Sequence, residues 1–137
     1  MRALTFIVAA IAAIAVVGSG MAVRTSGQTA LNVTYWANGV QGGDPQTWTL
    51  RCNPPRGTLP HPVVACRRLA TGGWKLVAPV PPGSICTEIY GGPQVARLVG
   101  FVQGKKVRAR FTRENGCQIS RWNRLAPWLL PAGGATS

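Results

Sequence analysis

Four cysteines constrain what this 137-residue chain can fold into: Cys52, Cys66, Cys86 and Cys117. Their meaning depends on residues 1–22, where one positive residue, an apolar run and a few small residues have the layout of a secretory signal peptide. Export leads to an oxidising compartment, where an even number of cysteines in a small chain indicates disulfides. Four cysteines allow three pairings, and the sequential pairing, Cys52 with Cys66 and Cys86 with Cys117, is the simplest.

The length of the chain argues for one domain, which we expect over residues 31–130. A flexible leader at residues 23–30 should precede it, and a disordered tail at residues 131–137 should follow it. The apolar run is shorter than the ~20 residues that a membrane-spanning helix needs. We therefore expect a secreted, extracellular protein without stable membrane insertion, with an uncleaved membrane anchor as the alternative.

The charge of the chain is strongly positive, with 15 Lys and Arg against 3 Asp and Glu and a net charge of +12. Such a surface attracts polyanions such as cell-wall polymers, anionic lipid head groups or nucleic acid. No basic run is interleaved with aromatic residues, as stacking on bases would require, so no specific nucleic-acid partner is predicted. A basic surface that only aids solubility is the simpler interpretation.

The order of the expected elements indicates the α+β class, because strands and helices do not alternate. Alternating apolar and polar residues favour strands at residues 31–36, 46–52 and 106–111. Residues 95–102 should pair with residues 106–111 as a hairpin across a glycine turn, and residues 127–130 could form a last short strand. Short helices are expected at residues 63–70 and 118–125, and residues 74–77 should be a short strand or an extended segment. The expected fold is therefore a five-stranded antiparallel sheet with two short helices and two disulfides.

The residue types present, and their positions in the sequence, do not match a catalytic site or a metal site. A Ser-His-Asp set would need His61 and Asp44, which both lie in loops rich in glycine and proline, without a nucleophile turn. A glycosidase would need two facing carboxylates from Asp44, Glu88 and Glu114. Zinc is not expected, because no two cysteines have C-x-x-C spacing and there is one histidine. The sequence predicts no enzyme, metal or cofactor.

One short segment stands between rigid and sharply turning backbone: prolines and a glycine precede it, and Gly91, Gly92 and Pro93 follow it. An extended segment held in this way can add as a strand to a protease cleft. Preorganisation also reduces the ordering entropy that binding must overcome. On loop chemistry alone, an ordinary bridged loop is an equal alternative. The candidate protease-contacting residues are Ile85, Cys86, Thr87, Glu88, Ile89 and Tyr90.

Three regions carry a resemblance to a known family. The first region is residues 48–69, where the matching residues are Thr49-Leu50-x-Cys52, Pro55, Gly57-Thr58, His61-Pro62 and Ala65-Cys66. The second region is Cys86-x-x-Ile89-Tyr90 followed by Pro93. The third comprises Gln103-Gly104-Lys105-Lys106-Val107 and Asn115-x-Cys117. Together with the four cysteines, they resemble the Streptomyces subtilisin inhibitor family over residues 31–125.

The resemblance implies a five-stranded antiparallel sheet with two short helices, and the sequential disulfide pairing. It also implies tight, substrate-like inhibition of secreted subtilisin-type serine proteases. The charge of Glu88 adds proteases that accept glutamate as candidate targets. The reactive bond would be Glu88–Ile89, with Glu88 in the primary specificity pocket and Cys86, Thr87 and Tyr90 along the cleft. The rival function is a non-inhibitory exported binding module that holds an anionic cell-wall polymer or another polyanion.

The chain departs from the family pattern at Glu88, at Gly91 and Gly92, and in its strongly basic charge. Glu88 stands where members typically carry methionine, lysine or another large or basic residue. Gly91 and Gly92 stand where one residue is expected before the proline, so the far side of the loop should be longer and looser. The resemblance also implies a possible homodimer, because members tend to pair through a sheet face. Such pairing would bring like charges together here if the face were that of Lys106, Arg108 and Arg110.

Overall fold

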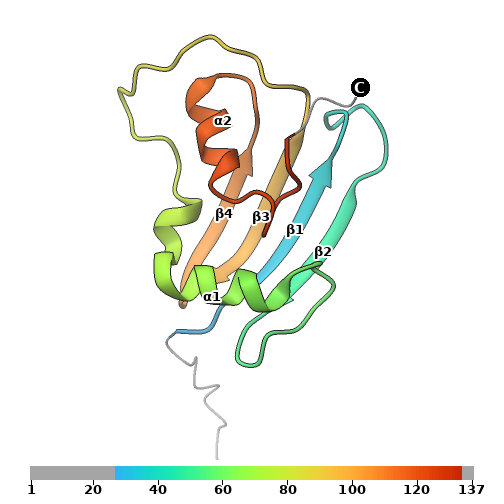
Figure 1. Ribbon diagram of the computed structural model, residues 1–137, viewed down its shortest axis with the longest axis vertical. Helices are drawn as coiled ribbons and strands as arrows, with labels where there is room; N and C mark the ends of the chain where they lie inside the picture. Colours follow the sequence, from blue (N-terminus) through green and yellow to red (C-terminus); the bar gives the residue numbers. More distant parts are fainter. Residues whose placement is uncertain (1–26, 134–137) are drawn as a thin grey trace, which may run out of the picture.

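A computed structural model describes residues 27–133 of the protein (Figure 1). The expected signal peptide and the last residues of the expected tail lie outside this range. Its elements, in chain order, are β1 (Ala30–Trp36), β2 (Gln46–Arg51), α1 (Pro62–Gly72), the 3-10 helix η1 (Gly73–Val77), β3 (Val95–Val102), β4 (Lys105–Phe111) and α2 (Gly116–Asn123). Along this range, no helix is long and apolar enough to cross a membrane.

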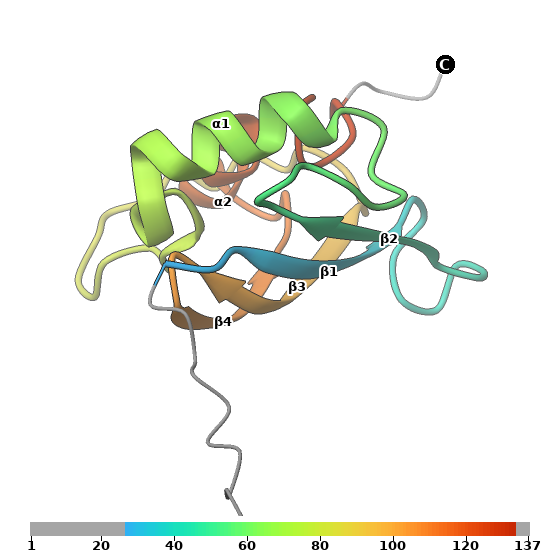
Figure 2. The ribbon, with the colours of Figure 1, turned by 90° about the horizontal axis from the view of Figure 1, so that it is seen from below.

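The four strands form one antiparallel sheet in the order β2-β1-β3-β4. Both α helices cover the same face of the sheet, and no helix among residues 27–133 covers the opposite face, which we call the open face (Figure 2). The covered face holds the core, because apolar residues alternate with polar ones along each strand. Leu31 lies opposite Leu50 and Gly100, and Val33 opposite Trp48 and Leu98, so the inward residues form continuous rows across the sheet. The expected α+β class and antiparallel sheet are confirmed.

The expected fifth strand at residues 127–130 is wrong. The backbone N–H groups of Leu129 and Leu130 both donate to the carbonyl of Leu125, at 2.8 and 3.1 Å, in turns of helical type. Trp128, Leu129 and Leu130 are all buried in the core. A short apolar run buried on every side has no periodicity that separates a strand from a turn.

Three other boundaries differ from expectation. Residues 74–77 belong to η1 rather than to a strand; Trp74 and Val77 are three residues apart, the spacing at which side chains of a 3-10 helix align. Helix α2 begins at Gly116, because the side chain of Asn115 caps it by accepting a hydrogen bond from the Gln118 N–H at 3.0 Å. The structured part starts before residue 31: Thr29 is buried, and its hydroxyl accepts a hydrogen bond from the Gln103 N–H at 3.0 Å.

Two disulfides join the cysteines in sequential order, Cys52 to Cys66 and Cys86 to Cys117. The first ties the end of β2 to α1 across 14 residues, and the second ties the loop before β3 to α2 across 31 residues. By loop-closure entropy, each should stabilise the fold by about 3 kcal/mol. The second bridge therefore fastens an otherwise irregular segment to a helix.

The open face of the sheet is basic. Arg97 lies directly opposite Arg110, and Lys106 and Arg108 are on the same side of β4 as Arg110. The Arg97 guanidinium stacks 5.7 Å from the centre of the Trp36 ring. The four strands contain no aspartate or glutamate, so this charge has no counterpart within the sheet.

Candidate functional site

The segment between η1 and β3 has no helix or strand and arches around α2 (Figure 1). Its large apolar side chains face solvent: Ile85 is 100% exposed, Ile89 61% and Tyr90 67%. Glu88 is also exposed. Side chains of this size are normally placed in a core or at an interface. The six residues predicted from sequence therefore form one surface segment, in which all but the half-buried Cys86 are exposed.

The N-terminal half of this segment rests on the first turn of α2. The Cys86–Cys117 disulfide joins the two covalently, and the Gly116 N–H donates a hydrogen bond to the Thr87 carbonyl at 2.9 Å. A side chain on residue 116 would collide with the Thr87 hydroxyl, so glycine there permits the close approach. The backbone just before Glu88 is thus fixed from behind.

The C-terminal half of the segment is held by Arg113, a buried residue that lies two positions after the end of β4. The Gly91 N–H donates to the Arg113 carbonyl at 2.7 Å, and Arg113 Nε donates to the Gly91 carbonyl at 3.0 Å. Arg113 Nη1 also donates to Asn123 Oδ1 at 3.2 Å, which fixes the guanidinium itself. The expected looseness beyond Tyr90 is therefore not found at Gly91, where both backbone polar groups are engaged.

The N-terminal root of the segment is held by a second guanidinium, Arg121, which is only 4% exposed. Arg121 Nε donates to the Ala78 carbonyl at 2.6 Å and Nη2 donates to the Val77 carbonyl at 3.0 Å. Nη1 donates to the Arg110 carbonyl on β4 at 2.6 Å. Burial lowers the pKa of Arg121 from its ordinary value, and the positive charge of Arg124 lowers that pKa further. Hydrogen bonds from a charged donor are stronger than those between neutral groups. Arg121 and Arg113 therefore hold the two ends of the segment firmly in place.

This geometry, an exposed segment with anchored flanks, can be compared with known proteins. The model of the family described as subtilisin inhibitor-like matches residues 27–115. The chain belongs to the subtilisin inhibitor-like family. Among solved structures, it is similar to Streptomyces caespitosus sermetstatin in complex with Bacillus licheniformis subtilisin, with a TM-score of 0.50 and 27% identity over 76% of this chain and 98% of that chain. A search of curated proteins found no match.

In this subtilisin inhibitor-like chain, Glu88 is the one residue tested for catalysis that lies within the anchored segment itself. Asp44 is exposed between β1 and β2, and His61 is exposed at the start of α1. Glu114 is exposed between β4 and α2. Within residues 27–133, no group of three His, Cys, Asp or Glu residues could hold a metal ion.

Sequence reasoning missed the residues that support the segment, above all Arg113, Gly116 and Arg121. One signal pointed to them: all three lie within four residues of Cys117, which the sequential pairing joins to Cys86. The neighbours of Cys117 must then lie behind the segment that contains Cys86. Their individual roles could not be assigned in this way.

Proposed function

We propose that this protein is a secreted, substrate-like inhibitor of subtilisin-type serine proteases that presents Glu88–Ile89 as its reactive bond. Membership of the subtilisin inhibitor-like family and the similarity to sermetstatin, which was solved bound to subtilisin, support protease inhibition. One observation carries the choice of bond: Glu88 and Ile89 lie in the exposed stretch between two anchored positions, Thr87 and Gly91. No cofactor or catalytic group of the inhibitor is needed for this function.

Binding would use the segment as an added strand. An extended backbone can pair with the edge of a protease cleft, while alternate side chains enter pockets. Glu88 would enter the primary pocket, and Cys86, Thr87 and Tyr90 would line the cleft on either side. Since the flanks are already fixed by hydrogen bonds and a disulfide, little additional entropy is lost when the complex forms.

Slow turnover follows from the same anchors. If the protease hydrolyses the Glu88–Ile89 bond, the new carboxyl end stays attached through Thr87 to α2, and the new amino end stays attached through Gly91 to Arg113. The two ends therefore remain close together at a high effective concentration, which favours resealing over release. The bound inhibitor should persist rather than be consumed as a substrate.

The proposal also includes secretion, directed by residues 1–22 as a signal peptide, and an oligomeric state that depends on salt. A homodimer built on the open sheet face would place Arg97, Arg108 and Arg110 of one copy near the same residues of the other. Like charges at this range repel unless salt screens them. We therefore propose a protein that is secreted and monomeric at low ionic strength, with face-to-face pairing only where salt is high.

The deciding experiment is a titration of the purified protein against subtilisin and against a secreted serine protease that accepts glutamate. We expect lasting, stoichiometric inhibition of at least one enzyme, and a slowly formed cut form whose new amino terminus is Ile89. Rapid turnover of the protein as a substrate would overturn the proposal in favour of a binding module. A cut elsewhere in the loop would leave inhibition standing and move the reactive bond.

A further inference from the structure

Strand β4 is the last strand of the sheet, so one of its edges pairs with β3 and the other pairs with nothing in the sheet. The direction of its backbone groups follows from the β3–β4 hairpin. Val102 lies opposite Lys105 across a two-residue turn, which makes them a hydrogen-bonded closing pair. Hydrogen-bonded and non-bonded pairs alternate from there. The N–H and C=O groups of Lys106, Arg108 and Arg110 therefore point outward, away from β3.

At Arg110, one of the outward backbone groups of β4 is already occupied. The Arg110 carbonyl accepts a hydrogen bond from Arg121 Nη1 at 2.6 Å, which agrees with its outward direction and blocks that end of the edge. Among residues 27–133, no hydrogen bond from outside the sheet reaches the backbone of Lys106 or Arg108. These two residues offer two donors and two acceptors to an incoming strand.

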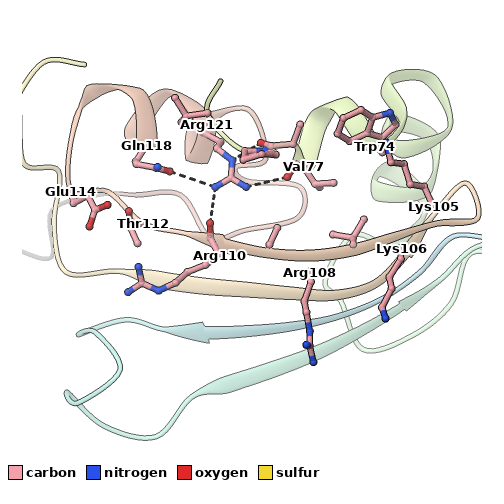
Figure 3. Close-up of a pocket in the computed structure, with 15 residues that line it drawn as sticks. Trp74, Val77, Lys105, Lys106, Arg108, Arg110, Thr112, Glu114, Gln118 and Arg121 are labelled. Carbon is pink, nitrogen blue, oxygen red and sulfur yellow. Dashed lines mark hydrogen bonds between the residues drawn. The ribbon is translucent and has the colours of Figure 1, made fainter. Parts of the chain in front are cut away.

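A groove of about 500 Å³ runs beside this edge (Figure 3). Its inner wall is apolar and comes from η1, the start of the loop, and the inward side of β4; the residues are Val77, Val80, Val107 and Ala109. Trp74 closes the end near the hairpin, where the Lys105 ammonium lies 3.2 Å from its ring centre. The volume is in the range of sites that bind ligands.

The two sides of β4 differ in chemistry. Lys106, Arg108 and Arg110 project from the side opposite to Trp74, Val77 and Arg121 (Figure 3). A strand added beside β4 would place alternate side chains next to these cations, and the others against the apolar wall. Glu114 supplies the single carboxylate of the groove lining. It lies beyond Arg110 in the chain, away from the free edge groups of Lys106 and Arg108.

We propose that the β4 edge binds an extended peptide segment of another protein in which acidic residues alternate with apolar ones. The acidic residues lie beside Lys106, Arg108 and Arg110, and the apolar residues fill the groove against Val77 and Val107. A second copy of β4 does not fit, since its cations would face those of the first. Acidic pairing is therefore favoured and self-pairing is opposed by the same three side chains.

The test measures binding of a fluorescent six-residue peptide of alternating glutamate and valine at low salt. Two matched peptides serve as controls: one with the glutamates and valines in separate blocks, and one N-methylated on the amides that would face β4. We expect binding of the alternating peptide, with roughly tenfold weaker binding of both controls. Hydrogen exchange at the Lys106 and Arg108 amides should slow only with the alternating peptide.

Two protein variants complete the test. Arg108→Glu should weaken binding of the alternating peptide roughly tenfold, whereas Arg67→Glu, an exposed change on α1, should leave it unchanged. Neither change lies in the protease-contacting loop, so both variants should inhibit a protease as well as the unmodified protein does. Measuring that inhibition checks that the variants are folded. Equal binding of all three peptides, equal binding of polyphosphate without amide protection, or no binding at all would overturn the proposal.

Discussion

Glu88 carries a charge that must leave water when the loop enters a protease's primary pocket. An apolar pocket offers that carboxylate no partner, and an unpaired buried charge is costly. A pocket with basic or hydrogen-bonding groups offsets the cost, while an acidic pocket repels the side chain. The proposed reactive bond therefore suits proteases that accept glutamate better than ordinary subtilisin or trypsin.

Replacing this one side chain should redirect the inhibitor. Glu88→Met should strengthen binding to subtilisin by roughly 1–3 kcal/mol, because it removes an unsatisfied buried group. Glu88→Lys should shift preference toward trypsin-like enzymes, whose pockets are acidic. Inhibition constants of the three proteins against subtilisin, trypsin and a glutamate-accepting protease check this. Identical constants for all three would show that residue 88 does not occupy the primary pocket.

At the scale of elements, the strands were readable because they bury one face. Alternation placed Leu31 and Val33 inward on β1 and Arg108 outward on β4, as the structure has them. Residues 127–130 are buried on all sides, and residues 74–77 are too few to form a recognisable pattern, so the sequence assigns neither segment correctly. Hydrophobic periodicity identifies an element that buries one side. It does not distinguish a strand from a helix or turn when the segment is buried on all sides or is only a few residues long.

The candidate loop was readable for a different reason: its prolines and glycines interrupt regular structure on both flanks. Its support was not readable. Arg113 and Arg121 bond to carbonyls 22 and 43 residues away, and nothing local separates them from the other basic residues. Arginine is rarely this buried, so sequence alone assigns it to the surface by default.

The two disulfides make a matched pair for testing the loop. Replacing Cys86 and Cys117 by serine should cost about 3 kcal/mol of stability, and replacing Cys52 and Cys66 should cost a similar amount. Only the first change frees the segment before Glu88, so only the first should speed cleavage of the bound inhibitor. Thermal unfolding and the rate of inhibitor consumption separate the two effects. Equal rates of consumption in both variants would mean that the Cys86–Cys117 bridge serves the fold alone.

At the scale of the whole molecule, α1 and α2 lie on one side of the sheet (Figure 2). The side chains of Lys106, Arg108 and Arg110 project from the other side (Figure 3). This asymmetry makes any face-to-face association depend on ionic strength. Sedimentation should find a monomer at low salt, and a dimer should form only as salt rises past about 0.5 M, where the Debye length falls to a few ångströms. A dimer that is stable at low salt would require a different interface.

The anchors of the loop also share a property that concerns acidity. Each is a disulfide, a backbone amide or an arginine, and none uses a carboxylate or an imidazole, the side chains that ordinarily titrate in moderately acidic conditions. Burial and Arg124 lower the pKa of Arg121 from a starting point far into the alkaline range. The shape offered to a protease is therefore expected to change little when the pH falls.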